Sequence, residues 1–492
     1  MTFVNQSFHK FVPPFIRRRL REQIYMRIVF INPPMAVTEQ IYTKRVARQY
    51  TSSAYVLPNT SIAYLAAYLE KIGFEVRIID AFALGLNIDE TAEEVRRFDP
   101  FAVCYSLCTQ NFLNTLSWIK GIKERTGLLT IVGGLQMSIY PREVLTYPEI
   151  DYGVIGDGWE TTPELLQCLT SHGDLSTVRG ICYREDGEYR ATDKRPVKFT
   201  LEDVPYMARH LLPNDRYTTV MTQEWPITIM LSALGCPLRC AYCDVPTGRH
   251  QARLPEHVVD EIDECVNRYG IREILFQDET FTLNRSRVLE TCELIRSRGL
   301  KFHWSIRARV DYVDREILHA MKEAGLTKIN FGIESGNPEI LKKMNRDIPL
   351  DVVRQAICWT KEEGLTTLGF FIIGFPGETE ADVKETIKFA LELDCDFIQV
   401  NKMVPQPPSP VYRELVERTG IDYWREYTLG NAGILGALPG IGSSFDPESL
   451  DIWQRRFFRK YYYRPSYILK RLKKISSFKE MKGLARAALS IR

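Results

Sequence analysis

Short apolar runs alternate with amphipathic stretches in two long series, and this alternation constrains the fold more than any other feature. The first series begins at Arg27 with "RIVFINPP" and ends near "DYGVIGDG". The second begins at Trp225 and contains six apolar runs, the last of which is "DFIQVNKMV". Strand–helix alternation at this spacing predicts parallel sheets with ligands at the carboxyl ends of their strands. We therefore predict an α/β protein, with a doubly wound, Rossmann-like domain followed by a partial or full parallel barrel of six units.

A chain of 492 residues is too long for one hydrophobic core, so we expect it to divide into domains. The segment "VRGICYREDGEYRAT" is typical of a hairpin that turns at Asp186-Gly187, and a proline-containing connector follows it. The predicted divisions are a first domain at 25–170, a linker with this hairpin at 171–224, a second domain at 225–420 and a helical, basic extension at 421–492.

The composition, with 45% hydrophobic and 26% charged residues, is that of a soluble globular protein. The sequence has no apolar run of the roughly 18 residues needed to span a bilayer, and its start shows no signal-peptide pattern. The 11 cysteines, an odd number, are not typical of a disulfide framework and favour a reducing cytoplasm. Seven cysteines are expected to pack as small apolar side chains, namely Cys104, Cys108, Cys168, Cys265, Cys292, Cys358 and Cys395.

Both ends of the chain are basic, although the formal net charge is only +2. Residues 1–27 sum to +5 and residues 455–492 to +12, which leaves −15 for residues 28–454. This acidic body is expected to repel a long polyanion, so no nucleic-acid partner is expected. The basic C-terminal end predicts weak binding to the inner membrane face, with aromatic rings at the interface. These rings are Phe457, Phe458, Tyr461, Tyr462, Tyr463 and Tyr467.

Three cysteines with CxxxCxxC spacing follow the first apolar run of the second series. They are Cys236, Cys240 and Cys243 in "LSALGCPLRCAYC". A structural zinc site would need a fourth ligand, for which Asp244, His250 and His257 are the nearest candidates. The alternative is an iron–sulfur cube, in which three thiolates hold three irons and leave the fourth iron open. An open iron would be a site for a substrate or a cofactor.

CxxxCxxC with Tyr242, placed after the first strand of a β/α series, resembles the radical S-adenosylmethionine enzymes. The resemblance covers residues 225–420 and implies a partial (β/α)6 TIM barrel with a 4Fe–4S cluster on the three cysteines. It also implies that the open iron binds S-adenosylmethionine, whose cleavage releases a 5′-deoxyadenosyl radical. One departure is Pro408-Ser409, where the family usually has Gly-Thr after the proline.

The resemblance also implies which segments contact S-adenosylmethionine. They follow successive strands, as in "QDETF", "WSIRAR", "GIESGN" and "LGFFIIGFPGET". Arginine suits a bidentate grip on a carboxylate, and we treat the two arginines of "WSIRAR" as alternatives for this role. The two glycines of "IIGFPGET", Gly374 and Gly377, would allow close approach to the adenine. The implied contacts are Tyr242, Asp278, Glu279, Arg307, Arg309, Glu334, Ser335 and Gly374.

A five-unit doubly wound domain ahead of such a barrel is similar to the cobalamin-binding branch of this superfamily. The matching segments include "IVGGLQMSIYPREVL" and "DYGVIGDGWETTPELL", in which Asp157 and Trp159 replace the usual acids. Residues 10–171 contain no histidine, so a bound cobalamin would be base-off with no imidazole ligand from this domain. The alternative is a vestigial domain that binds no corrinoid. The expected cobalamin contacts are Ser106, Thr109, Gly133, Gly134, Gly156 and Gly158.

The family resemblance implies an enzyme that modifies an unactivated carbon of a small-molecule or lipid-like substrate. Methyl transfer and ring closure both remain open, because the domain order resembles the anaerobic magnesium-protoporphyrin ester cyclases and the hopanoid-pathway proteins. A flavodoxin or ferredoxin is the expected electron donor. A methylthiotransferase is disfavoured, since Cys104, Cys108 and Cys168 match its second cluster poorly. The rival of another class is a zinc-stapled nucleic-acid-binding protein, which would hold zinc and no sulfide.

Overall fold

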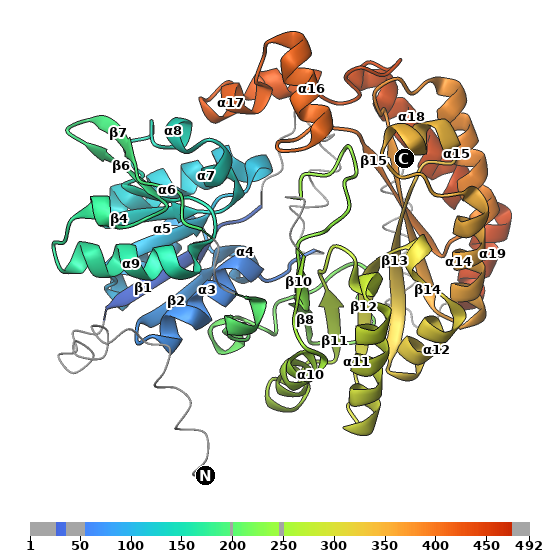
Figure 1. Ribbon diagram of the computed structural model, residues 1–492, viewed down its shortest axis with the longest axis horizontal. Helices are drawn as coiled ribbons and strands as arrows, with labels where there is room; N and C mark the ends of the chain where they lie inside the picture. The colour runs from blue at the N-terminus through green and yellow to red at the C-terminus, as the bar shows by residue number, and fades with distance from the viewer. Residues whose placement is uncertain (1–25, 36–54, 197–199, 246–249, 475–492) are drawn as a thin grey trace.

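The structure, a computed structural model, describes residues 26–35, 55–196, 200–245 and 250–474 (Figure 1). The predicted basic segment 1–27 and the last residues, 475–492, therefore lie almost entirely outside the described chain. Two parallel sheets, each covered by helices, form the two predicted domains. In the part of the chain that the structure describes, no helix is long and apolar enough to cross a membrane.

The first sheet has the order β2-β1-β3-β4-β5-β6-β7, and its first five strands are parallel. The reversal of strand order around β1 places a topological switch point between β1 and β3, where doubly wound folds bind ligands. The strands are β1 (Arg27–Asn32), β2 (Glu75–Asp80), β3 (Ala102–Ser106), β4 (Leu129–Gly133), β5 (Tyr152–Val154), β6 (Ile181–Glu185) and β7 (Glu188–Ala191). The helices are α3 (Thr60–Lys71), α4 (Ala81–Leu84), α5 (Ile88–Phe98), α6 (Phe112–Thr126), α7 (Leu135–Ile139), α8 (Pro141–Val144) and α9 (Gly158–Thr170).

The hairpin β6–β7 turns at Asp186-Gly187 as predicted, with both residues at positive φ. Its place differs from the prediction, because β6 pairs antiparallel with β5 and extends the first sheet. Arg184 fixes it there: the guanidinium donates to the carbonyls of Leu145 at 2.7 Å and Ile150 at 2.6 Å. The hairpin is therefore part of the first domain and not of the linker.

The second sheet has six parallel strands in the order β15-β14-β13-β12-β11-β8, which confirms the predicted partial barrel. The strands are β8 (Ile227–Met230), β11 (Glu273–Phe276), β12 (His303–Arg309), β13 (Leu326–Glu334), β14 (Thr366–Ile373) and β15 (Phe397–Lys402). The helices outside them are α10 (Pro255–Asp263), α11 (Arg285–Ser297), α12 (Arg315–Glu323), α13 (Pro338–Lys343), α14 (Leu350–Glu362) and α15 (Glu380–Leu393). Several begin at a side-chain cap, such as Thr379 of the capping box before α15.

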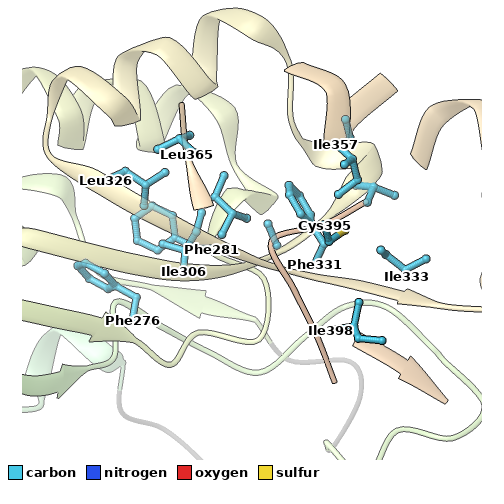
Figure 2. Packing of buried hydrophobic residues seen from close by; sticks show 14 of the residues in the cluster. Phe276, Phe281, Ile306, Leu326, Phe331, Ile333, Ile357, Leu365, Cys395 and Ile398 are labelled. Atoms are coloured by element: carbon cyan, nitrogen blue, oxygen red, sulfur yellow. The ribbon is translucent and has the colours of Figure 1, made fainter. Parts of the chain in front are cut away.

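The core of the second domain lies between the strands and the outer helices (Figure 2). Alternate residues of each strand, such as Ile306 on β12 and Phe331 on β13, point outward into it. The residues between them face the inside of the barrel and are more polar, as Arg307 and Asn330 illustrate. The alternation thus separates a packed shell from a polar inner face.

The predicted C-terminal extension divides between the two domains. Helix α17 (Tyr423–Thr428) packs on the first domain, where Trp424 and Tyr427 join its core, and so does α16 (Pro410–Thr419), which lies within the predicted second domain at 225–420. Helices α18 (Pro447–Tyr462) and α19 (Pro465–Lys474) pack on the barrel. The prediction that the tail aromatics lie at a membrane interface is wrong for Phe457, Tyr461 and Tyr467, because the barrel core buries all three.

A buried ion network joins the linker to the barrel. Glu261 on α10 accepts from Arg209 of the linker and from Arg253, each at 2.7 Å, and all three side chains are almost fully buried. The Arg253 guanidinium also lies over the ring of Tyr64 on α3 at 5.4 Å. The Glu261 carboxylate therefore binds two buried guanidinium groups. Arg209 connects the linker to the barrel, and Arg253 reaches the first domain at Tyr64.

Five of the seven cysteines predicted to be packed are buried, namely Cys104, Cys168, Cys265, Cys292 and Cys395. The prediction is wrong for Cys108 and Cys358, which are exposed. Cys358 lies on the solvent side of α14 and donates to Glu362 at 3.3 Å. Cys108 lies after β3, at the carboxyl edge of the first sheet.

Candidate active site

The loop with the three cysteines leaves the barrel after β8. A two-stranded ribbon closes the base of this loop, because β9 (Ala233–Leu234) pairs antiparallel with β10 (Gln251–Ala252). The tip of the loop is held by backbone contacts: the Ala241 N–H donates to the carbonyl of Met344 at 2.9 Å. Ala241 and Tyr242 also pack on an apolar cluster that includes Phe375 and Met403. The apolar cluster therefore shields one side of the cysteine loop from water.

The three thiols lie close enough to affect one another. Burial raises the pKa of the Cys236 thiol, and the nearby Cys240 and Glu279 raise it further. Burial also raises the pKa of Cys243 to about 12, again with contributions from Cys240 and Glu279. Within the described residues, no three His, Cys, Asp or Glu side chains surround one point as ligands of a single metal ion would. Three neighbouring thiols fit a 4Fe–4S cluster, which takes one thiolate per iron.

The zinc ligands considered from the sequence do not complete such a site. His257 lies on α10 and pairs with Glu202 of the linker. His250 lines a groove of about 650 Å³ with residues at the start of α11. Asp244 is half-buried beside Cys243, and burial raises the pKa of its carboxyl. The positions of these three side chains therefore do not support a structural zinc site.

Arg346 is a site residue that the sequence analysis missed. Its guanidinium is buried beside the cysteine loop, with Nη1 at 3.9 Å from the Cys240 sulfur and 3.3 Å from the Tyr242 hydroxyl. Nη2 donates to the carbonyl of Gly332 at 2.6 Å. Among the described atoms Nε has no hydrogen-bond partner. A buried donor without a partner at this point fits the carboxylate of a bound S-adenosylmethionine.

Glu334 and Tyr242, two of the expected S-adenosylmethionine contacts, both lie beside this arginine and beside each other. Glu334 ends β13 with a φ of +69°, and its carboxylate lies 3.7 Å from Arg346. Burial raises the pKa of Glu334, whereas Arg346 lowers it. Burial and the Glu334 charge raise the pKa of Tyr242 well above its ordinary value. Tyr242 is therefore a neutral donor at the edge of the site.

Arg307 and Arg309 share the inner face of β12, because residues two apart on a strand point the same way. The face of the strand therefore does not decide which of the two grips a carboxylate. Arg307 donates to the Gln277 amide oxygen at 2.6 Å, whereas Arg309 forms a two-point ion pair with Asp311 at 2.8–2.9 Å. Glu279 is solvent-exposed, yet the surrounding protein partly desolvates its carboxyl and raises its pKa; Arg307 opposes that shift, so these two side chains lie near each other.

Three predicted S-adenosylmethionine contacts have other partners in the structure. Asp278 is buried and accepts from the backbone N–H and the hydroxyl of Ser232. Ser335 is fully buried, and its hydroxyl lies 3.0 Å from that of Thr386 on α15. At Gly374, with φ at +82°, a Cβ would come within 2.9 Å of Leu450, so this glycine accommodates α18. The polar or close contacts of these residues are with the protein itself.

The predicted cobalamin contacts gather at the carboxyl edge of the first sheet. Gly134 approaches the loop after β3 so closely that a Cβ would lie 2.7 Å from the Leu107 carbonyl. Thr109 Oγ1 and Gln136 Oε1 are buried there without a hydrogen-bond partner among the described residues. Such acceptors fit a large ligand with amide side chains. Ser106 and Gly133 end β3 and β4, whereas Gly156 and Gly158 lie between β5 and α9.

This edge faces the cysteine loop of the barrel. Cys108 is exposed, yet the surrounding protein desolvates its thiol and raises the pKa, and the charge of Asp244 adds to the shift. Because Asp244 follows Cys243 directly, its effect on Cys108 places the carboxyl edge of the first sheet near the cysteine loop.

Comparison with known proteins gives the same two domains. A family profile described as the Radical SAM superfamily matches residues 230–390, and one described as the B12 binding domain matches residues 50–166. A structure of the cobalamin-dependent S-adenosylmethionine radical enzyme OxsB, with aqua-cobalamin and S-adenosylmethionine bound, aligns with a TM-score of 0.70. It covers 95% of this chain and 71% of that chain at 18% identity, which is a likeness of fold.

Two relatives extend the similarity over most of the sequence. An uncharacterized methyltransferase of Pyrococcus horikoshii is 30% identical over 420 residues, covering 84% of this chain and 89% of the relative. The anaerobic magnesium-protoporphyrin IX monomethyl ester cyclase of Cereibacter sphaeroides is 27% identical, covering 82% of this chain and 66% of the relative. With its cysteine loop and its doubly wound first domain, the chain belongs to the radical S-adenosylmethionine superfamily, in the branch that carries a B12-binding domain.

Proposed function

We propose that this radical S-adenosylmethionine enzyme methylates an unactivated carbon, with cobalamin as the methyl carrier. The observation that carries the proposal is that Cys108, exposed at the cobalamin edge, lies within electrostatic reach of Asp244, beside the cysteine loop. A methyl group held at the first edge could reach a carbon held at the second. Ring closure is the other outcome that the family resemblance implies.

The residues divide between the two cofactors. We propose that Cys236, Cys240 and Cys243 hold the 4Fe–4S cluster, which with S-adenosylmethionine supplies one-electron cleavage and a carbon-centred radical when bound. Arg346 is positioned to bind the carboxylate of S-adenosylmethionine, and Glu279 its amine. The apolar cluster behind the loop excludes water from that side.

Cobalamin should bind without a nitrogen ligand from the first domain, because residues 10–171 contain no histidine and His172 follows the end of α9 that lies away from the carboxyl edge. Protein loaded with cobalt(II) cobalamin is expected to give an electron paramagnetic resonance spectrum without nitrogen superhyperfine splitting. Free base-on cobalamin at neutral pH is the control. With methyl-deuterated S-adenosylmethionine, the label is expected in the bound corrinoid, as shown by mass spectrometry.

Resolved nitrogen splitting would contradict the base-off geometry. Absence of label from a corrinoid that does bind would count against methyl transfer and favour ring closure. Failure to bind any corrinoid would support the vestigial domain.

A small-molecule substrate and a reductant are typical of radical S-adenosylmethionine enzymes. We propose a cytoplasmic flavodoxin or ferredoxin as the specific donor. Both are small, acidic carriers that transfer single electrons. Reduction of the reconstituted cluster by each purified carrier, followed by absorption spectroscopy, would rank them.

We also propose weak binding to anionic membranes through α19. Ile468 and Leu469 are exposed on this helix, within a segment of net charge +12 at residues 455–492. Replacing both with aspartate should weaken co-sedimentation with anionic liposomes at low salt by about tenfold or more, since two apolar side chains no longer insert. Ile421→Asp, at a similarly exposed position just before α17, should leave co-sedimentation unchanged. Equal pelleting of all variants would refute the contact.

A further inference from the structure

The cysteine loop is anchored at its base by a buried residue, Ser232, which lies between β8 and β9. The backbone N–H of Ser232 donates to Asp278 Oδ1 at 2.7 Å, and its hydroxyl donates to Oδ2. Its carbonyl accepts from Arg287 Nη2 and from the Arg253 N–H, each at 2.9 Å. Every polar group of Ser232 therefore has a partner.

These partners are buried and belong to different elements. Asp278 follows β11 and is 1% exposed, whereas Arg287 lies in the first turn of α11 and is 9% exposed. Arg287 Nε also donates to the carbonyl of Arg253, beside the ribbon β9–β10. Asp278 thus binds the N–H and the hydroxyl of Ser232, and Arg287 binds its carbonyl, so the residue from which the cysteine loop departs is held from both sides.

We propose that Asp278 is a positioning residue, which acts through Ser232 to set the direction of the cysteine loop and so the fit of the cluster. The inference rests on the proposed role of the three cysteines as cluster ligands. Buried, charge-assisted hydrogen bonds behind metal ligands hold those ligands in place for the metal. Asn345 completes the support at the tip, where its amide donates to the Arg239 carbonyl at 2.6 Å.

The rival role for Asp278 is direct binding of the S-adenosylmethionine amine. The geometry argues against it, because both carboxylate oxygens are engaged by Ser232 and the side chain is buried. The adjacent Glu279 is exposed, and its charge acts on the Cys236 and Cys243 thiols. Asp278 therefore supports the cysteine loop, whereas Glu279 faces the proposed cofactor site.

Asp278→Asn tests the proposal, since it keeps the size of the side chain and removes its charge. Anaerobically reconstituted protein is mixed with an iron chelator, and iron release is followed by absorption. We expect release about 10- to 100-fold faster than in the wild type, the usual effect of losing a support behind metal ligands. The reduced cluster should also show an altered electron paramagnetic resonance line shape. Ser232→Ala should change both in the same direction, and the double variant should add little to Asp278→Asn alone.

The matched control is Asp396→Asn on the far side of the barrel. Asp396 is also buried and accepts from the N–H and hydroxyl of a single residue, Thr367, at 3.1 and 3.2 Å. The Asp396→Asn protein should lose about as much thermal stability as the Asp278→Asn protein, but it should release iron at the wild-type rate. If Asp278→Asn unfolds at the assay temperature, Ser232→Ala, which keeps the carboxylate, provides the measurement.

The outcomes separate the two proposals. Wild-type iron release in both Asp278→Asn and Ser232→Ala would overturn the positioning role while leaving the cluster site intact. Weaker binding of S-adenosylmethionine by Asp278→Asn, with an unchanged cluster, would instead assign Asp278 to the cofactor. A wild-type protein that holds no cluster would overturn the proposed function itself.

Discussion

Replacing Cys236, Cys240 and Cys243 together with alanine is expected to remove the iron–sulfur cluster and abolish cleavage of S-adenosylmethionine. Each thiolate is the expected ligand of one iron, and the described structure offers no substitute set of three ligands. Iron and sulfide contents should fall to background, and 5′-deoxyadenosine should no longer form when the reduced protein is given S-adenosylmethionine. Colorimetric iron and sulfide assays and chromatography of the nucleoside measure both.

Cys358→Ala is the control, because Cys358 is an exposed thiol on the barrel that lies away from the cysteine loop. It should retain the cluster and the activity. A triple variant with full iron and sulfide would refute the site, provided that its circular dichroism matches the wild type.

Glu261→Ala is expected to produce the largest loss of stability from a single substitution. It leaves the guanidinium groups of Arg209 and Arg253 buried without their shared carboxylate. Breaking a buried ion pair by removing one partner costs about 3–5 kcal/mol. The free energy of unfolding, measured in denaturant by tryptophan fluorescence, should fall by that order.

Glu93→Ala on α5 provides the comparison. Glu93 forms exposed ion pairs with Arg96 and Arg97, and exposed pairs contribute about 1 kcal/mol or less. A Glu261→Ala variant no less stable than Glu93→Ala would show that the buried network does not hold the linker to the barrel.

The strands and their parallel pairing could be predicted because parallel β/α units carry their own signal. The hydrophobic runs at "REILFQ" and "DFIQVNKMV" became β11 and β15 in the predicted barrel. The hairpin turn was also predictable, since Asp186-Gly187 suits positive φ at both positions. Its partner strand was not, because antiparallel pairing with β5 depends on the edge left open by the whole first sheet.

The site was predictable at the level of segments and less so at the level of side chains. "QDETF" indicates an acidic turn after β11, but only packing shows that Asp278 turns to Ser232 while Glu279 is exposed. Arg346 lies beyond α13, and its approach to Cys240 depends on how the chain returns over the loop. A basic residue two positions from an apolar residue on each side, Met344 and Ile348 in "KKMNRDI", was the available signal.

The tail shows how one pattern can support two interpretations. Aromatic rings among cations suggested a membrane interface, but Trp453, Phe457 and Tyr461 recur at helical spacing. That spacing is typical of a stripe packed on a core, and all three are buried against the barrel.

The return of the chain from the barrel to the first domain has a consequence for protein engineering. Residues 410–438 supply Trp424, Tyr427 and Leu435 to the core of the first domain, although hundreds of positions separate them from β1. A fragment that ends before the barrel would leave that core open, and a barrel expressed alone would carry the unmatched apolar face. Exchange of cobalamin modules between relatives by a single crossover in the linker should therefore yield insoluble chimeras. A second crossover that transfers α16 and α17 with the module should restore solubility, so the natural unit of exchange is discontinuous in sequence.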